Sequence, residues 1–205
     1  KKETNGRINL KKGDTISSHI LKKFFYNSSG TAVPDPITAD EFSFLRNIGG
    51  GIMMSKPGQY DQVYEYDINS WYPHLMLNMQ FPVKRGDIKT IKLSDLLKED
   101  FARYGIYNVK IDTAGQFYLR QDKDDMYTHY DLNMAKKLGL CITSVDESEY
   151  VHACIYDTDK RETGQRLFER TIDEFYSLKL KKLPQVKRML NSLWGALCEK
   201  SSKLI

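Results

Sequence analysis

The chain has 205 residues, of which 40% are hydrophobic and 28% charged, and its formal net charge is +4. This composition is typical of a globular protein and argues against wholesale disorder, while +4 is too small to indicate a nucleic-acid partner by itself. Three scattered cysteines argue against a disulfide framework or a zinc site and favour a reducing compartment. No apolar run approaches the ~20 residues needed to cross a membrane, so no membrane partner is expected.

Helical patterns and loops alternate over the first fifty residues. Ile20, Leu21, Phe24 and Phe25 recur at helical spacing and predict a short amphipathic helix from Ser18. Residues 27–36, with two prolines, a glycine and two serines, predict a loop. Thr38 followed by Glu41 is a capping-box pattern, so a second helix is expected to begin there, with Phe42, Leu45 and Ile48 on one side.

A glycine run and a polar stretch then follow. Gly49-Gly50-Gly51 favours a helix end and a turn, although three glycines would also let another backbone approach closely. Residues 52–55 and 63–67, on either side of Pro57-Gly58, predict a β-hairpin. Asp67 stands at the end of the second strand, before a helix expected at residues 74–79. Two interpretations of Asp67 stay equally weighted here: a turn-capping side chain and a metal ligand held at a strand tip.

The middle of the chain predicts a mixture of short strands and helices. Strands are expected at residues 88–93, 106–112 and 116–119, with a helix at 94–104. Residues 125–138 read as a helix with Leu132, Met134 and Leu138 as core positions. Residues 141–155 predict a pair of strands around the acidic turn 146–149, which is interpreted as solvated.

Two helices are predicted at the C-terminal end, at residues 165–183 and 185–199, separated by Pro184. The second has an apolar face formed by Val186, Met189, Leu190, Leu193, Trp194 and Leu197. Another stripe of the same helix carries Lys187, Asn191 and Gly195, each four residues apart. Five cations fall within residues 179–188, which fits either a solvated basic helix or a phosphate site.

The two stretches together resemble a known pattern. Asp67-Ile68-Asn69-Ser70-Trp71-Tyr72-Pro73 resembles motif A of family B DNA polymerases, D-x-x-S-L-Y-P. Residues 187–195, K-R-M-L-N-S-L-W-G, resemble their motif B, K-x-x-x-N-S-x-Y-G. The short approach to motif B and the glycine run before motif A are most similar to the protein-primed branch of linear phage, plasmid and viral genomes.

The resemblance implies a role for each matching residue. Asp67 would be catalytic and would bind two Mg²⁺ ions, with Mn²⁺ as a possible substitute, helped by the Ile68 carbonyl. The nucleotide-binding residues implied are Ser70, Tyr72, Lys187, Asn191 and Gly195, with Tyr72 excluding a 2′-hydroxyl and Lys187 neutralising the triphosphate. The DNA-binding residues implied are Gly50, Gly51, Ser192 and Trp194.

Several positions depart from the family pattern. Trp71 replaces the usual leucine, which is interpreted as a packing change, and Trp194 replaces the motif B tyrosine, which removes a hydroxyl. Ile48 stands where the template-contacting Y-x-G-G/A element has its tyrosine. Tyr156-Asp157-Thr158-Asp159 looks like motif C but precedes motif B, whereas motif C follows motif B in this family, so it is expected to be non-catalytic.

The implied protein is a DNA-directed DNA polymerase of α+β fold, a nucleotidyltransferase of DNA replication. Residues 1–79 would be a partial palm, 80–160 an inserted subdomain that contacts a terminal (priming) protein, and 161–205 the fingers. Its partners would be DNA template and primer and dNTP, in an intracellular location such as a mitochondrion or a virus-infected cell. Lys1 in place of Met indicates a fragment or processed chain. Because motif C follows motif B in this family, motif C is expected after Ile205, and the exonuclease motifs are expected before Lys1. The chain alone is therefore expected to extend no primer. The alternative is a non-catalytic nucleic-acid-binding relic of such a gene.

Overall fold

The computed structural model describes residues 15–28, 35–46, 48, 51–52, 55–113, 115, 119, 125–181, 183 and 185–197. The chain divides into two compact units, described separately. Unit 1 comprises residues 1–34, 65–83 and 162–205, and unit 2 comprises residues 35–64 and 84–161. Helices and antiparallel sheet strands are both present, which confirms the predicted α+β class.

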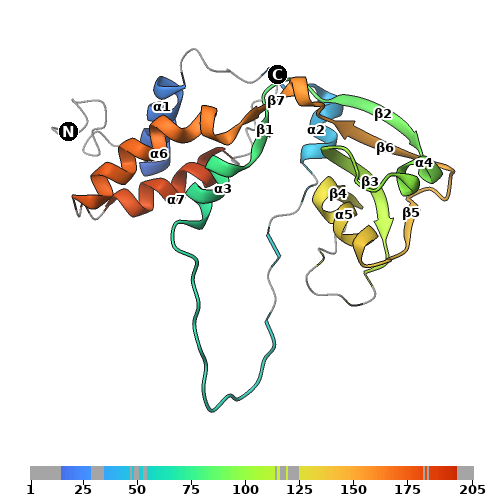
Figure 1. The fold of residues 1–205 in the computed structure, drawn as a ribbon, viewed down its shortest axis with the longest axis horizontal. Coiled ribbons are helices and arrows are strands. Elements are labelled where there is room, and N and C mark those ends of the chain that lie inside the picture. Colours follow the sequence, from blue (N-terminus) through green and yellow to red (C-terminus); the bar gives the residue numbers. More distant parts are fainter. Residues whose placement is uncertain are drawn as a thin grey trace. The chain divides into compact units, whose positions relative to one another are not determined.

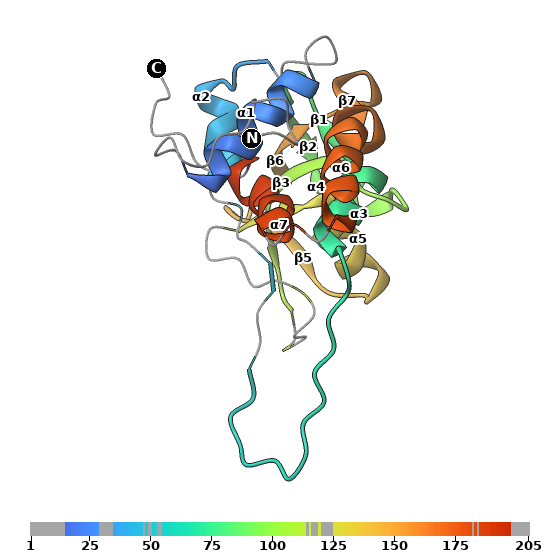
Figure 2. The ribbon, with the colours of Figure 1, turned by 90° about the vertical axis from the view of Figure 1, so that its left-hand side faces the viewer.

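Unit 1 is a group of helices around one apolar core (Figure 1). Its helices are α1 (Ile16–Asn27), α3 (Trp71–Asn78), α6 (Gly164–Leu180) and α7 (Gln185–Leu197). The strands β1 (Gln80–Pro82) and β7 (Arg161–Thr163) pair where the chain enters and leaves this group. Helix α1 packs on both α6 and α7, and α3 packs on the same two helices, as the turned view shows (Figure 2).

The core of unit 1 follows the helical pattern of the sequence. Phe24 of α1 stacks on Phe168 of α6 with ring centres 5.1 Å apart, and Phe81 meets Phe168 edge-on. The buried residues of α7 are Val186, Met189, Leu190, Leu193 and Ala196, which recur every three or four positions. The helices predicted from Ser18, at 165–183 and at 185–199 are therefore confirmed. Helix α6 ends at Leu180, and residues 198–199 lie outside the described residues.

Unit 2 is an antiparallel sheet with strand order β2-β6-β3-β4, and β5 also pairs with β3. Its strands are β2 (Asp87–Lys92), β3 (Gly105–Ile111), β4 (Met126–Thr128), β5 (Ile142–Ser144) and β6 (Tyr150–Ile155). Its helices are α2 (Ala39–Leu45), α4 (Leu93–Lys98), α5 (His129–Lys137) and the 3₁₀ turn η2 (Thr158–Lys160).

Both faces of this sheet are covered. In the β3–β6 register Ile106 lies opposite Cys154, and Tyr107 lies opposite Ala153. Neighbouring residues of a strand point to opposite faces, so the first pair joins Phe44 of α2 while the second joins the main core with Leu132 of α5. The predicted strands at 88–93 and 106–112 are confirmed within one residue.

Helix α2 begins at the predicted cap. The Thr38 hydroxyl accepts a hydrogen bond from the Glu41 amide at 3.2 Å. The Glu41 carboxylate is buried and accepts hydrogen bonds from the Gly86 amide at 3.1 Å and the Tyr156 hydroxyl at 2.7 Å. The capping pattern thus marks the helix start correctly, while the glutamate ties the helix to the sheet.

Four predictions for secondary structure need correction or stand untested. Residues 55–68 form no strand: Val63 is 76% and Tyr66 is 90% exposed, because β-favouring residues form a strand only where a neighbour pairs with them. The two strands predicted within 141–155 are present as β5 and β6, but their predicted pairing with each other is wrong, since both pair with β3. The helix predicted at 125–138 begins with strand β4, and Met134 and Leu138 are exposed. Residues 116–118 lie outside the described residues.

Candidate active site

The turn that carries Asp67 leads directly into α3 of unit 1. Asp67, Ile68 and Asn69 are exposed. Ser70 has φ 57° and ψ 35°, a left-handed conformation that costs a non-glycine residue about 1–3 kcal/mol. Its carbonyl accepts a hydrogen bond from the His74 amide at 3.0 Å, which closes the first turn of α3. Backbone strain of this kind is common at functional sites, where the surrounding structure stabilises the strained conformation.

Helix α6 also contacts this turn. Lys179 Nζ donates a hydrogen bond to Ser70 Oγ at 3.3 Å and lies 5.1 Å from the ring centre of Tyr176. In the sequence, Lys179 is one of five cations within ten residues, and nothing in that pattern singles it out. Its role depends on how α6 packs against α3, which is a tertiary feature.

The predicted stripe on α7 faces away from the core. Lys187, Asn191 and Gly195 are exposed, while Leu190 and Leu193 of the same helix are buried. A Cβ added at Gly195 would meet no atom within 4 Å. The described protein therefore gives no packing reason for glycine at this position, although glycine costs a helix interior about 1 kcal/mol relative to alanine.

One cavity of about 420 Å³ brings the two motifs together. From the Asp67 side it is lined by residues 67–73, and from the helices by Lys179, Lys187, Leu190 and Asn191. The predicted site residues Asp67, Ile68, Ser70, Tyr72, Lys187 and Asn191 thus share one cavity. An accidental likeness at two separate places in the chain does not require this proximity.

An aromatic contact also joins the motifs. The rings of Tyr72 and Trp194 lie stacked, with centres 6.1 Å apart and planes 21° apart. The tryptophan that replaces the motif B tyrosine therefore supports the motif A tyrosine directly. Trp71, interpreted from the sequence as a packing change, is 44% exposed and lies outside the core cluster of unit 1.

The remaining predicted site residues lie elsewhere or outside the description. Ser192 and Gly195 are on α7 but do not line the cavity. Gly51 is an exposed residue of unit 2, and Gly50 lies outside the described residues.

The donor atoms of the cavity suit Mg²⁺. Magnesium is commonly bound by one or two carboxylates together with substrate phosphates and water. Asp67 and the Ile68 carbonyl are oxygen donors of this kind, and Lys179 and Lys187 supply positive charge for phosphates. Within the described ranges, no three His, Cys, Asp or Glu side chains cluster as a complete metal site. Asp67 would therefore hold metal only together with the substrate or with further ligands.

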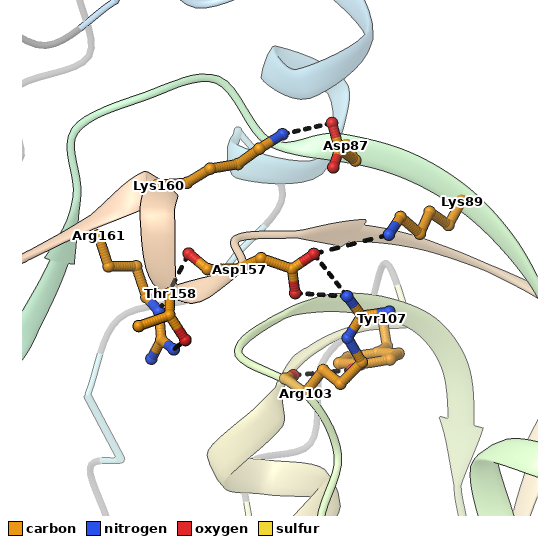
Figure 3. A network of polar contacts seen from close by, with 8 residues as sticks. All are labelled: Asp87, Lys89, Arg103, Tyr107, Asp157, Thr158, Lys160 and Arg161. Carbon is orange, nitrogen blue, oxygen red and sulfur yellow. Dashed lines mark hydrogen bonds and ion pairs between the residues drawn. The ribbon is translucent and has the colours of Figure 1, made fainter.

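The motif C lookalike has a structural role in unit 2 (Figure 3). The Arg103 guanidinium donates hydrogen bonds to both Asp157 carboxylate oxygens, and Lys89 Nζ lies 3.7 Å away. The Arg103 hydrogen bonds hold the pKa of Asp157 below its usual range. Lys160, at the position of the family's serine, pairs with Asp87. Asp157 is thus already neutralised by cations of its own unit.

Among the described helices, none is long and apolar enough to span a bilayer.

Comparisons with known proteins give one clear result. No curated protein and no solved structure matches the chain. The family described as DNA polymerase type B, organellar and viral, matches residues 1–202. With nearly its whole length matched, and with motifs A and B on one cavity, the chain belongs to the organellar and viral type B DNA polymerases.

Proposed function

We propose that the cavity between α3, α6 and α7 binds an incoming dNTP with Mg²⁺ for template-directed DNA synthesis. The observation that carries this proposal is that Asp67 and Lys187, distant in sequence, line one cavity, which Lys179 of α6 also lines. A carboxylate and two ammonium groups around one cavity are the groups that a metal–triphosphate complex needs.

Each side chain has a distinct task in this proposal. Lys187 and Lys179 bind the negatively charged phosphates, and Asn191 offers an amide between them and the base. Tyr72, backed by Trp194, forms a flat surface under the sugar that leaves no room for a 2′-hydroxyl. Asp67 and the Ile68 carbonyl would hold Mg²⁺, or Mn²⁺ in its place, which when bound activates the attacking hydroxyl and stabilises the leaving phosphate.

The wider assignments are part of the same proposal. Residues 1–79 act as partial palm, 80–160 as an inserted subdomain for a terminal protein, and 161–205 as fingers, with DNA primed by that protein. Gly50, Gly51, Ser192 and Trp194 contact DNA, and Gly195 admits the nascent base pair. The family supports an organelle or a virus-infected cell as the place of action.

The proposal is tested by dNTP binding to the chain, measured calorimetrically with and without Mg²⁺. Lys187→Ala should weaken dNTP binding roughly tenfold, because a charge-assisted phosphate contact is lost. Lys98→Ala removes an equally charged, exposed side chain of unit 2 and should leave the affinity unchanged. Equal affinities of the Lys187 variant and the wild type would contradict the phosphate role.

The metal role is tested separately. Asp67→Asn should abolish the strengthening of dNTP binding by Mg²⁺, whereas Asp61→Asn, in the same exposed segment, should not. In a polymerase that contains this chain, Asp67→Asn should abolish primer extension, and near-normal extension would remove Asp67 from the site. A non-catalytic nucleic-acid-binding relic would bind DNA but would show no Mg²⁺-dependent affinity for dNTP.

A further inference from the structure

A second cavity, here called the Trp71 cavity, shares the Asp67 turn with the first. Its volume is about 470 Å³, within the range of small-ligand sites. Ile68, Asn69, Ser70, Trp71 and Pro73 line both cavities. Five further residues line the Trp71 cavity but not the first one: His74, Leu77, Ile172, Asp173 and Tyr176. It contains no lysine or arginine among these residues, so its chemistry differs from that of a phosphate site.

Flat aromatic side chains dominate this cavity. Trp71 is 44% exposed and lies nearly parallel to His74, with planes 14° apart and ring centres separated by 6.0 Å. That separation makes an offset stack, which leaves indole surface uncovered. Tyr176 adds a third ring, and the buried residues Ile172 and Pro73 add apolar lining. Such walls favour a flat, apolar-faced ligand.

The polar groups of the Trp71 cavity further restrict the kinds of ligand that it can bind. Asp173 is exposed and makes no hydrogen bond or ion pair with the described part of the chain. A carboxylate only accepts hydrogen bonds, so it selects a ligand edge that carries N–H donors and repels an anion. Lys179, which lies over the Tyr176 ring and lines the first cavity, supplies positive charge at the border between the two.

We propose that the Trp71 cavity binds an unpaired base of single-stranded DNA. The base stacks on Trp71, its N–H edge meets Asp173, and its phosphate lies toward Lys179. That the polymer is DNA rests on the proposed function, whereas the stacking and the carboxylate preference do not. Guanine presents two adjacent N–H donor groups, while thymine presents one N–H between two carbonyls, so the site prefers guanine to thymine.

The preference is measured with two dye-labelled single strands, one of thymines only and one with a single central guanine. Fluorescence anisotropy should show roughly fivefold or greater preference for the guanine strand, in line with one discriminating base contact. Asp173→Asn should bring this ratio close to one. Because loss of any negative charge strengthens DNA binding in general, the ratio between strands, rather than either affinity, is the informative quantity.

Asp159→Asn is the matched control for charge. Asp159 is an exposed residue of unit 2 that lines neither cavity, so its variant should keep the wild-type ratio. Trp71→Leu, which introduces the residue usual in the family, should weaken binding of both strands roughly fivefold or more through lost stacking. Circular dichroism of each variant separates loss of binding from loss of fold.

The fluorescence of Trp71 shows whether the base binds in the Trp71 cavity. The chain has two tryptophans, so Trp194→Phe leaves Trp71 as the reporter while keeping a ring face on Tyr72. The guanine strand should quench Trp71 fluorescence. Absence of quenching at saturation, or a guanine preference that survives Asp173→Asn, overturns this site. Loss of Mg²⁺-dependent dNTP binding with intact quenching would instead count against the proposed function alone.

Discussion

Lys23 of α1 is a charged side chain inside the core of unit 1. Its side chain is 3% exposed and its Nζ lies 2.7 Å from Glu174 Oε2, whose side chain is 31% exposed. Asn27 donates hydrogen bonds to Glu174 Oε2 at 3.3 Å and to Thr171 Oγ1 at 3.1 Å. This small network joins α1 to α6, and the two partners of its ion pair differ sharply in their access to water.

That difference predicts unequal effects of removing each partner. Glu174→Gln leaves a buried ammonium without a counter-charge and should lower the free energy of unfolding by about 3 kcal/mol. Lys23→Met should cost less than about 1 kcal/mol, because an apolar chain of similar size replaces the ammonium and the remaining carboxylate is hydrated. Urea denaturation measures both. Glu169→Gln, exposed on the same helix, is the control, and equal losses for the two variants would contradict the explanation.

At the scale of elements, two glycines on helices α6 and α7 have opposite surroundings. A Cβ at Gly164 would lie 1.8 Å from the Met76 carbonyl oxygen and 2.9 Å from that of Met79, both backbone atoms. Gly164 also donates a hydrogen bond to Met79 O at 2.7 Å. This glycine permits α6 to start against the end of α3. At Gly195, by contrast, a Cβ has free space.

Alanine at each position should therefore change stability in opposite directions. Gly164→Ala should destabilise unit 1 by about 2 kcal/mol or more, because backbone must move. Gly195→Ala should stabilise it by about 1 kcal/mol, the gain of alanine in a helix interior. If the bare patch admits a base pair, Gly195→Ala should also weaken primer–template binding in anisotropy titrations. A stabilised variant with unchanged DNA binding would remove Gly195 from the interface.

Local patterns predicted the elements that depend on local interactions. The apolar stripe of α7 and the cap of α2 are properties of one segment, and both were read correctly from the sequence. The strand expected at 63–67 failed because pairing depends on a neighbour, and β5 and β6 were mispaired for the same reason. Motif spacing selected Asp67 and Lys187, whereas the contact of Lys179 with Ser70 and the exposure of Trp71 arise only when α3 and α6 pack.

At the scale of the whole molecule, the chain passes between the two units at residues 34/35, 64/65, 83/84 and 161/162. Each unit has its own core, so each can lose structure under different conditions. Unit 2 contains a group that makes it sensitive to acid. His129, buried at the start of α5, packs on Tyr104 and Tyr130 and accepts a hydrogen bond from the Gly105 amide.

Burial lowers the pKa of His129 from 6.5 to about 4, and the nearby Arg161 acts in the same direction. Between these pH values the unfolded chain takes up a proton that folded unit 2 does not, so stability falls as the pH falls. The loss should reach about 3 kcal/mol near pH 4, at 1.36 kcal/mol per unit of pKa difference. Hydrogen exchange of amides in β3 and β6 should therefore accelerate from pH 6.5 to pH 4 after correction for the intrinsic rate.

His129→Gln keeps a hydrogen-bond acceptor but cannot titrate, so it should remove most of this acid sensitivity. His152→Gln, at an exposed position on β6, should retain the wild-type pH dependence. The dNTP cavity belongs to unit 1, so mild acid should open β3 and β6 before it abolishes dNTP binding. Simultaneous loss of both at one pH, in wild type and His129→Gln alike, would show that the units unfold as one and that His129 does not set the transition.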